Sequence, residues 1–355
     1  MRLKATCLFC CIVAMIQSVA RGFQLGAPRL LTKRCMNEFH SSSASSNEKT
    51  INYEFITSAN NPKVKFLKSL QTAKKREETQ LVLVEGHRMV IDAVKAGAVL
   101  NTVMFTQKSL STPLGEKLDS ILRTLHTKCV LCEVPDHVLA TVSETVTSQG
   151  VIAAFEKPLH VKQELSKILH NKQSDEETLL VVLDGVRDPG NMGTLIRTAY
   201  GLGANAVVAV SGCDVWSSKV LRAATGVQLL ADVAMPVLEH DAWDHVHAYL
   251  QKVETANKGK NLPARIGKQQ EVQIIVSSSY DDADSVPFYE VDYTAPSVIV
   301  VGSEATGVSD AALACPGKVI KVRIPMAREL DSFNAGVAGA MLLAEAAKQR
   351  QVQKK

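Results

Sequence analysis

The stretch that decides the fold runs from Val298 to Arg350 of the 355-residue chain and reads VIVVGSEATGVSDAALACPGKVIKVRIPMARELDSFNAGVAGAMLLAEAAKQR. A run of β-branched residues, Val298–Val301, stops at Gly302-Ser303-Glu304, which is typical of a buried strand that ends in a tight loop. A second apolar run, Val319–Ile324, stops at Pro325, and a polar loop and a helix rich in Ala and Gly follow. Because open α/β sheets bind ligands at the carboxyl ends of their strands, this stretch predicts a ligand crevice.

Patterns of strands and helices alternate through residues 178–350, which we expect to form one domain. The predicted strands upstream of Val298 are Thr178–Leu183, Ala206–Val210, Leu229–Met235 and Val272–Ser277. The predicted helices between them are Asn191–Leu202, Ser217–Thr225 and His240–Thr255, and Lys258–Gln270 is predicted to be a polar loop. This alternation predicts an α/β fold with a mostly parallel sheet that helices cover on both faces.

Residues 55–158 have the pattern of a smaller α/β domain. Ser58 and Asn61-Pro62 open a predicted helix, and four apolar runs predict strands at Leu81–Val84, Leu100–Phe105, Lys128–Val134 and Gly150–Phe155. A polar connector, Lys157–Glu177, contains a helical stretch at Lys162–His170 and marks a domain boundary.

The net charge of +4 gives no argument for nucleic-acid binding. Six basic residues and one acid lie within the first 40 residues, so the rest of the chain is close to neutral. Any RNA-binding surface must therefore be local. The densest basic patch consists of Lys63, Lys65, Lys68, Lys74, Lys75 and Arg76. Two interpretations compete for this patch. It could contact RNA phosphates, or it could be an ordinary solvated helix face. The neighbouring acids Glu77 and Glu78 favour the solvated face.

The eight cysteines are scattered, which suits a reducing compartment. Cys129 and Cys132 have the spacing of a metal or redox pair, but no second pair matches them and apolar neighbours favour a buried strand. We therefore expect no metal site.

Residues 1–50 have the composition of a targeting segment. A basic start is followed by an apolar run, Cys7–Ile16, that is too short to span a bilayer. Several arginines and a serine cluster, Ser41–Ser46, come after it. The segment resembles the bipartite presequences of plastid proteins, and a mitochondrial presequence has similar features. We expect a disordered, cleaved presequence and import into one of these organelles.

Three motifs occur in order along the chain: LDGVRDPGNMGTLIRTA at Leu183–Ala199, GSEATG at Gly302–Gly307, and a segment from Arg323 to Ala338 that contains RIPM and SFNAGVA. Together they resemble the SpoU (TrmH-type) RNA ribose methyltransferases of the SPOUT superfamily. The segments SANNPKVK, VEGHRMV and SQGVIAAF of residues 55–158 resemble the substrate-binding domain that precedes the catalytic domain in many of these enzymes, which is itself similar to small RNA-binding ribosomal proteins.

The resemblance implies a trefoil knot in the catalytic domain, a homodimer, and transfer of a methyl group from S-adenosyl-L-methionine to a ribose 2′-hydroxyl. Gly302, Ser303, Ile324, Met326 and Phe333 would hold this cofactor, and Phe333 stands where the family more often has leucine. Ribosomal RNA is favoured over transfer RNA as the substrate.

The resemblance also assigns catalytic positions. These are Asn191, Arg197, Glu304, Ser332 and Asn334. A guanidinium is almost always protonated and is a poor base, so we expect Arg197 to bind phosphate and stabilise the 2′-oxyanion. Structural alternatives remain open: Asn191 as a helix cap, and Glu304 as an acid paired with an arginine.

Three residues outside the assigned positions carry expectations of their own. Arg328 could pair with a nearby acid and not touch the substrate, and Asp188 is expected in a turn. Arg88 could contact RNA or serve packing at a helix start.

Three rival functions are a transfer-RNA methyltransferase, an inactive RNA-binding or ribosome-assembly factor of the same fold, and a base methyltransferase of the same superfamily. The motif residues oppose the inactive factor. A dinucleotide-dependent oxidoreductase is opposed by the glycine spacing.

Overall fold

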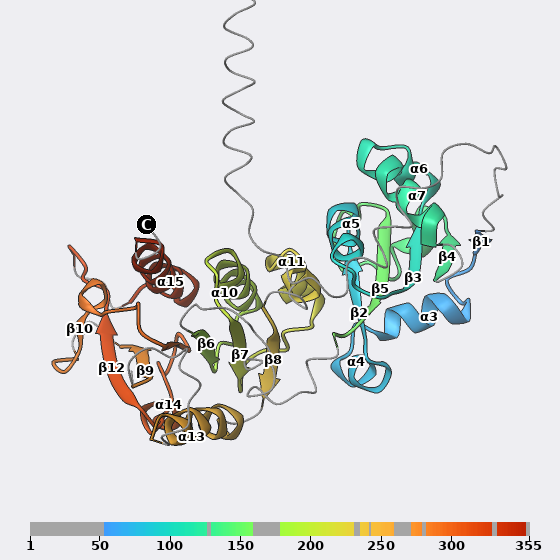
Figure 1. The fold of residues 1–355 in the computed structure, drawn as a ribbon. Helices are drawn as coiled ribbons and strands as arrows, with labels where there is room; N and C mark the ends of the chain where they lie inside the picture. The colour runs from blue at the N-terminus through green and yellow to red at the C-terminus, as the bar shows by residue number, and fades with distance from the viewer. Residues whose placement is uncertain are drawn as a thin grey trace, which may run out of the picture. The chain divides into compact units, whose positions relative to one another are not determined.

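The computed structural model describes residues 53–125, 129–158, 178–230, 235–240, 243–258, 271–278, 282–328 and 332–352. All of them belong to one compact unit of the chain, residues 51–355. Two separate sheets organise this unit, and helices flank each of them (Figure 1). The predicted presequence, residues 1–50, and the predicted helix Lys162–His170 lie outside the described residues.

The first sheet has five strands in the order β1-β4-β3-β5-β2. Strands β1, β4 and β3 run parallel to one another, and β5 pairs antiparallel with β3 and β2. The strands are β1 (Glu54–Phe55), β2 (Leu81–Glu85), β3 (Leu100–Phe105), β4 (Val130–Glu133) and β5 (Val151–Glu156). The strands predicted from the apolar runs are thus present, and the two-residue β1 was not predicted.

Helices cover both faces of the first sheet. On one face Val82 and Val84 pack in the same core as residues of α5 (His87–Lys95) and α7 (Pro113–Leu125). On the other face Leu81 and Leu83 pack with α3 (Pro62–Ser69) and α8 (Asp136–Leu139). The remaining helices of this part are α4 (Ala73–Thr79) and α6 (Gln107–Leu110). Helix α3 begins after Asn61, whose side chain accepts a hydrogen bond from the Lys63 amide at 2.8 Å.

The second sheet has seven strands in the order β10-β12-β9-β11-β6-β7-β8, and every pairing in it is parallel. The strands are β6 (Leu179–Asp184), β7 (Ala206–Val210), β8 (Val237–His240), β9 (Gln273–Ser277), β10 (Val286–Pro287), β11 (Ser297–Gly302) and β12 (Lys318–Arg323). The expected parallel α/β sheet is confirmed.

Alternate residues of the central strands enter two different cores, as expected for a sheet with both faces buried. In β6, Leu179 and Leu183 join one core, whereas Leu180 and Val182 join the other. Each core is completed by helices that lie on that face of the sheet.

The helices of the second sheet divide between its two faces. Those on the face of Leu179 are α10 (Pro189–Gly201), α11 (Ser218–Ala223), α12 (Val227–Leu230) and α15 (Ala335–Val352) (Figure 1). Those on the face of Leu180 are α13 (Asp244–Lys258) and α14 (Asp310–Leu313). A 3₁₀ turn, Phe288–Glu290, follows β10.

The strand predicted at Leu229–Met235 is wrong. Leu229 lies in helix α12, residues 231–234 lie outside the described residues, and the strand of this region is β8, which begins at Val237. Pro236 precedes β8, and its carbonyl accepts a hydrogen bond from the amide of Val207 in β7 at 3.0 Å. An apolar run of this length suits a buried helix as well as a strand, so periodicity alone did not separate them. The predicted helix His240–Thr255 accordingly starts later, at Asp244.

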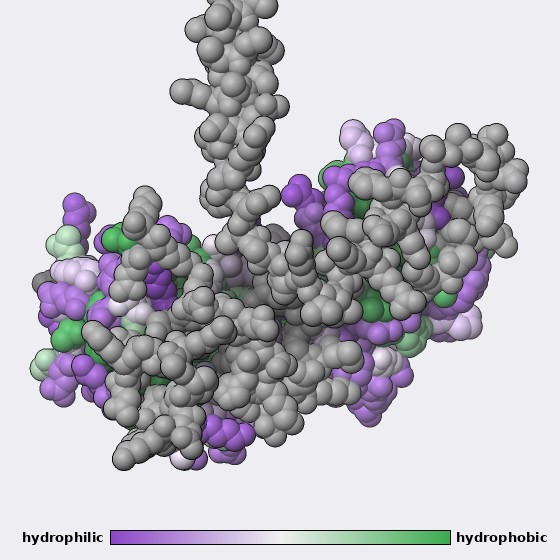
Figure 2. Space-filling model, in the orientation of Figure 1, coloured by the Kyte–Doolittle hydropathy of each residue, from purple (hydrophilic) through white to green (hydrophobic). Residues whose placement is uncertain are grey.

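The surface of the described residues is mainly hydrophilic in the view of Figure 2, with apolar residues scattered over it. Among these residues, no helix is long and apolar enough to cross a membrane. The predicted loop Lys258–Gln270 lies outside the described residues from residue 259 onward.

Candidate cofactor pocket and catalytic residues

A cavity of about 460 Å³ lies at the carboxyl ends of β9, β11 and β12, where the order of the strands predicts a ligand crevice. This volume lies within the range of about 300–1,000 Å³ that small-molecule pockets occupy. The lining residues are Ser277, Ser278, Val301, Gly302, Ser303, Glu304, Ala305, Thr306, Gly307, Val308, Val322, Ile324, Met326, Ser332, Phe333, Ala335, Ala338 and Leu342. We call this cavity the strand-end pocket.

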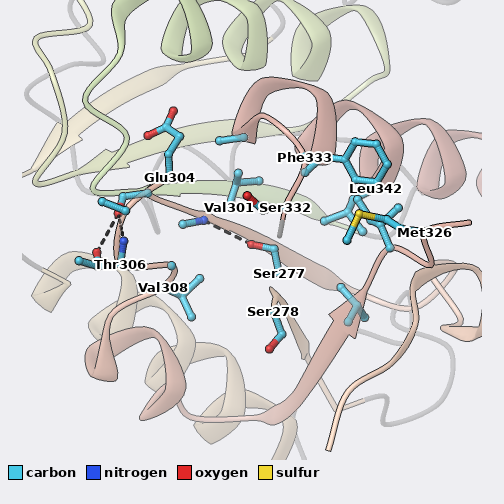
Figure 3. Close-up of a pocket in the computed structure, with 18 residues that line it drawn as sticks. Ser277, Ser278, Val301, Glu304, Thr306, Val308, Met326, Ser332, Phe333 and Leu342 are labelled. Carbon is cyan, nitrogen blue, oxygen red and sulfur yellow. Dashed lines mark hydrogen bonds between the residues drawn. The ribbon is translucent and has the colours of Figure 1, made fainter. Parts of the chain in front are cut away.

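The strand-end pocket has an apolar side and a polar side. Phe333, Leu342 and Met326 gather on one side of it, whereas Glu304 and Thr306 lie on the other (Figure 3). Such a lining offers apolar contact to a flat ring and hydrogen bonds to polar groups of the same ligand. All five residues that the sequence assigns to the cofactor line this pocket: Gly302, Ser303, Ile324, Met326 and Phe333.

The loop after β11 folds tightly back on itself. The amide of Ser303 donates to the carbonyl of Gly307 at 2.9 Å, and the amide of Gly307 donates to the carbonyl of Ser303 at 3.0 Å. A Cβ atom on Gly302 would lie 2.3 Å from the carbonyl carbon of Gly307. Only glycine therefore allows the loop to pass this close to the strand end, and Gly307 itself has a φ of 69°.

A buried carboxylate, Asp184, anchors the far end of the same loop. Its side chain is 5% exposed and accepts hydrogen bonds from the Ser309 amide at 2.6 Å and from Trp243 Nε1 at 3.1 Å. Asp184 also pairs in register with Gly302 of β11. It thus holds both ends of the loop that lines the pocket, a role that the sequence analysis missed.

Two serines at the end of β9 were also missed. The hydroxyl of Ser277 accepts a hydrogen bond from the Gly302 amide at 3.4 Å (Figure 3), and Ser278 donates to Asp282 at 2.6 Å. This second bond, together with the Lys321 ammonium, lowers the pKa of Asp282. The strand-end rule that located Gly302 could have located these serines, because β9 is the neighbour of β11.

Asn191, Glu304 and Asn334 come together beside the pocket from three separate segments. Nδ2 of Asn191 donates a hydrogen bond to the carboxylate of Glu304. A Cβ atom on Gly336 would lie 3.1 Å from Oδ1 of Asn191 and 3.1 Å from Oδ1 of Asn334. Gly336 therefore leaves space for the two amide side chains to approach each other.

The structural alternatives for Asn191 and Glu304 are decided in part. The cap of α10 is Asp188, whose Oδ1 accepts from the Asn191 amide at 2.7 Å, so the expectation of Asn191 as the cap is wrong. Glu304 makes no ion pair with any arginine among the described residues, and its carboxylate accepts a hydrogen bond from the side-chain amide of Asn191.

The remaining motif residues lie on the segment that leads into α15. Asn334 precedes α15, and its Oδ1 accepts from the Val337 amide at 3.3 Å. Ser332 is exposed and lines the pocket. Arg328 is exposed, and the acids at 329 and 331 lie outside the described residues.

Arg197 does not line the strand-end pocket of its own chain. It is exposed and lines a second cleft instead. Arg197 follows Asn191 by six residues in the same helix, α10. At about 100° per residue, six residues turn the side chain by about 240°, so the two side chains leave α10 in directions about 120° apart.

The basic patch divides into exposed lysines and one buried arginine. Lys65, Lys68 and Lys74 are exposed and have no ion pair to any described residue. Lys63 pairs with Glu54, and Lys75 pairs with Glu78 at 3.1 Å.

The expectation that Arg76 contacts RNA is contradicted by its burial, since the residue is only 4% exposed. Arg76 forms an ion pair with Asp214, and its Nη1 donates to the carbonyls of Leu70 at 2.8 Å and Gln71 at 2.7 Å. It is a structural residue that cannot reach a phosphate.

Both cysteines of the Cys129–Cys132 pair are free thiols. Cys132 lies buried in β4, and burial raises the pKa of its thiol to about 11. No group of three or more potential metal ligands occurs within the described ranges.

The fold and the pocket define an α/β protein with a small-molecule site at the ends of parallel strands, next to a glycine loop and an Asn–Glu pair. Residues 178–344 match the SpoU rRNA Methylase family, and residues 61–153 match the MRM3-like substrate binding domain. The chain is 31% identical over 306 residues to the mitochondrial rRNA methyltransferase 3 of Homo sapiens, across 77% of this chain and 69% of that protein.

Two further relatives extend the comparison. The chain is 28% identical to the 23S rRNA (guanosine(2553)-2′-O)-methyltransferase RlmP of Bacillus subtilis, across 81% of this chain and 97% of that protein. The crystal structure of an AdoMet-bound rRNA methyltransferase from Sinorhizobium meliloti has a TM-score of 0.63 and 28% identity, and the match covers 83% of this chain and 98% of that one.

The chain belongs to the SpoU rRNA methylase family, which confirms the resemblance that its three motifs carry. It is an S-adenosyl-L-methionine-dependent RNA methyltransferase. The strand-end pocket fits this cofactor in volume and in its mixed apolar and polar lining. Because Gly302 has no side chain, its main chain is open to close approach by the cofactor.

Proposed function

We propose that the chain methylates the ribose 2′-hydroxyl of an organellar ribosomal RNA. The observation that carries this proposal is the strand-end pocket with the Asn191–Glu304 pair at its edge, in a chain that has all three family motifs. The names of the human and Bacillus subtilis relatives support ribosomal RNA as the substrate, and the human protein's name supports a mitochondrial location.

The bound cofactor supplies an electrophilic methyl group, and the residues of the chain hold and orient the reacting parts. Ile324 and Met326 would contact the adenosine through the strand-end main chain, with the Phe333 ring against it. Gly302 and Ser303 would hold the amino-acid part of the cofactor. Much of the rate should come from positioning and from fixed charges.

The methyl acceptor would be held by Asn191, Ser332 and Asn334, which would bind the ribose hydroxyl and fix the loop before α15. Glu304 would orient the side-chain amide of Asn191. Arg197 would stabilise the developing 2′-oxyanion and bind the adjacent phosphate, because its guanidinium stays charged. These roles rest on the family motifs together with the placement of the side chains.

The position of Arg197 supports a homodimer. It lines the second cleft and not the strand-end pocket of its own chain, so we propose that it serves the pocket of a second copy. Mixed dimers test this arrangement. Arg197→Ala and Phe333→Asp chains, each inactive alone, should regain activity on mixing if the residues act across subunits. A mixture as inactive as its parts would contradict it.

Three further proposals follow from the sequence and from membership in the family. We propose a substrate-binding domain at residues 55–158 and a catalytic domain at 178–350, a trefoil knot in the latter, and a cleaved presequence at 1–50.

The proposed function is tested by titrating the protein with S-adenosyl-L-methionine in a calorimeter and by assaying methyl transfer to ribosomal RNA transcripts. We expect binding by both the wild type and Arg197→Ala, and loss of transfer only in the variant. Absence of binding by the wild type would favour an inactive RNA-binding factor.

A further inference from the structure

A second cleft of about 470 Å³ lies apart from the strand-end pocket and contains Arg197. The lining residues are Glu85, Arg88, Met89, Asp92, Thr145, Thr147, Gln149, Arg197, Arg222, Thr225 and Leu230. Elements of both sheets therefore build it: α5 and the loop before β5 on one side, and α10 to α12 on the other. We call it the arginine cleft.

Three guanidinium groups reach the arginine cleft from three different helices. Arg88 comes from α5, Arg197 from α10 and Arg222 from α11. The two acids of the cleft are already engaged. Glu85 accepts hydrogen bonds from two hydroxyls of the loop, each at 2.6 Å, and Asp92 pairs with Arg88 at 2.7 Å. The lining thus has one more arginine than acids, and neither of these two acids pairs with Arg197 or Arg222 among the described residues, although Glu144 pairs with Arg222 at 3.8 Å.

Arg222 has unused capacity to donate hydrogen bonds. Its Nη1 is buried and has no hydrogen-bond partner, and the nearest carboxylate oxygen, on Glu144, lies 3.8 Å away. A buried charged donor without an acceptor is costly. An anion in the cleft would satisfy it, and a guanidinium recognises phosphate oxygens especially well.

Polar groups that suit a ribose stand beside these charges. Thr147 and Gln149 are exposed on the loop before β5 and line the cleft with Thr145. A hydroxyl or amide can exchange hydrogen bonds with a ribose 2′-hydroxyl, which is the group that distinguishes RNA from DNA.

We propose that the arginine cleft binds the sugar-phosphate backbone of the RNA substrate, with Arg88 and Arg222 as phosphate contacts in addition to Arg197. This inference rests on the proposed function. It assigns to the cleft the RNA segment that flanks the methylated nucleotide, so that the substrate touches both halves of the chain at once. Of the two roles considered for Arg88, it selects RNA contact.

The test uses Arg88→Gln and Arg222→Gln in the full chain, with a fluorescein-labelled 20-nucleotide single-stranded RNA of mixed sequence as the probe. Each lost phosphate contact should lower the slope of log affinity against log salt by about 0.7. That slope corresponds to an affinity loss of about 4-fold at 0.15 M salt and about 8-fold at 0.05 M.

Arg123→Gln is the matched control. Arg123 is exposed on α7 and pairs with Asp119 at 2.8 Å across four residues, as Arg88 pairs with Asp92, but it does not line the cleft. It should bind the probe within about 2-fold of the wild type. Calorimetry with S-adenosyl-L-methionine and thermal melting check that each variant keeps its fold and its cofactor affinity.

The possible outcomes separate the two proposals. If the wild type methylates ribosomal RNA while Arg88→Gln and Arg222→Gln bind the probe like Arg123→Gln, the arginine cleft is not an RNA site and the proposed function stands. If the wild type neither binds the cofactor nor transfers methyl groups, the proposed function itself fails. A salt slope that falls in both cleft variants and not in the control supports the cleft.

Discussion

Replacement of Gly302 by alanine should displace the loop that lines the strand-end pocket. The added Cβ would lie 2.3 Å from the carbonyl carbon of Gly307 and 2.5 Å from the amide nitrogen of Val308. Carbon contacts are optimal at about 3.5–4.0 Å, so the loop has to move by about 1 Å or more. Because the atoms in its way belong to the main chain, no side-chain rotation relieves the clash.

The cost should appear both in stability and in cofactor binding. Crowding of this kind costs about 1–3 kcal/mol, which corresponds to a Tm lower by about 2–12 °C. Since the displaced loop lines the pocket, calorimetry should show S-adenosyl-L-methionine affinity reduced at least about tenfold, or about 1.4 kcal/mol.

Gly193→Ala provides the control for general destabilisation. A Cβ atom there would lie 2.4 Å from Cβ of Ala223 and 2.8 Å from the amide nitrogen of Ala224, between α10 and α11 and outside the pocket lining. It should lower the Tm by a similar amount and leave cofactor affinity within about twofold. Wild-type cofactor affinity in Gly302→Ala, or an equal loss of affinity in Gly193→Ala, would contradict a specific role of Gly302 in the pocket.

Three other substitutions test the roles assigned to Asp184, Arg76 and Glu304. Asp184→Asn turns one buried acceptor into a donor that faces the Ser309 amide. It should lower the free energy of unfolding in urea by about 1–3 kcal/mol and raise the KM for the cofactor. An unchanged KM would show that the loop needs no anchor. Arg76→Met should destabilise the protein by about 3–5 kcal/mol because it leaves the partly buried carboxylate of Asp214 without its ion-pair partner. A weaker RNA affinity at unchanged stability would instead support phosphate contact by Arg76. Glu304→Gln keeps an acceptor for the Asn191 amide and should retain most activity, whereas Glu304→Ala should lower kcat about tenfold. Equal kcat values in the two variants would contradict the proposal that Glu304 orients Asn191.

The sequence predicted most of the strands because a buried parallel strand is a continuous apolar run with a sharp end. The bounds predicted for Leu100–Phe105 and Ala206–Val210 coincide with β3 and β7. The prediction failed at Leu229–Met235, where Leu229 and Leu230 belong to helix α12 and the strand starts only after Pro236.

The residues predicted to hold the cofactor lie together in the structure. The glycine loop lines one pocket together with Ile324, Met326, Ser332 and Phe333. The sequence could not show that Arg76 is buried, since its partner Asp214 lies 138 residues further on. Nor did it reveal that Arg197 lines a second cleft and not the strand-end pocket of its own chain.

The most direct test of the account is the chemical position of the transferred methyl group. Ribosomal RNA transcripts are incubated with the protein and S-adenosyl-L-methionine labelled on the methyl group, and then digested with alkali. A 2′-O-methyl blocks cleavage at its own ribose, so we expect the label in an alkali-resistant dinucleotide. Label found in mononucleotides would show methylation of a base and contradict the account.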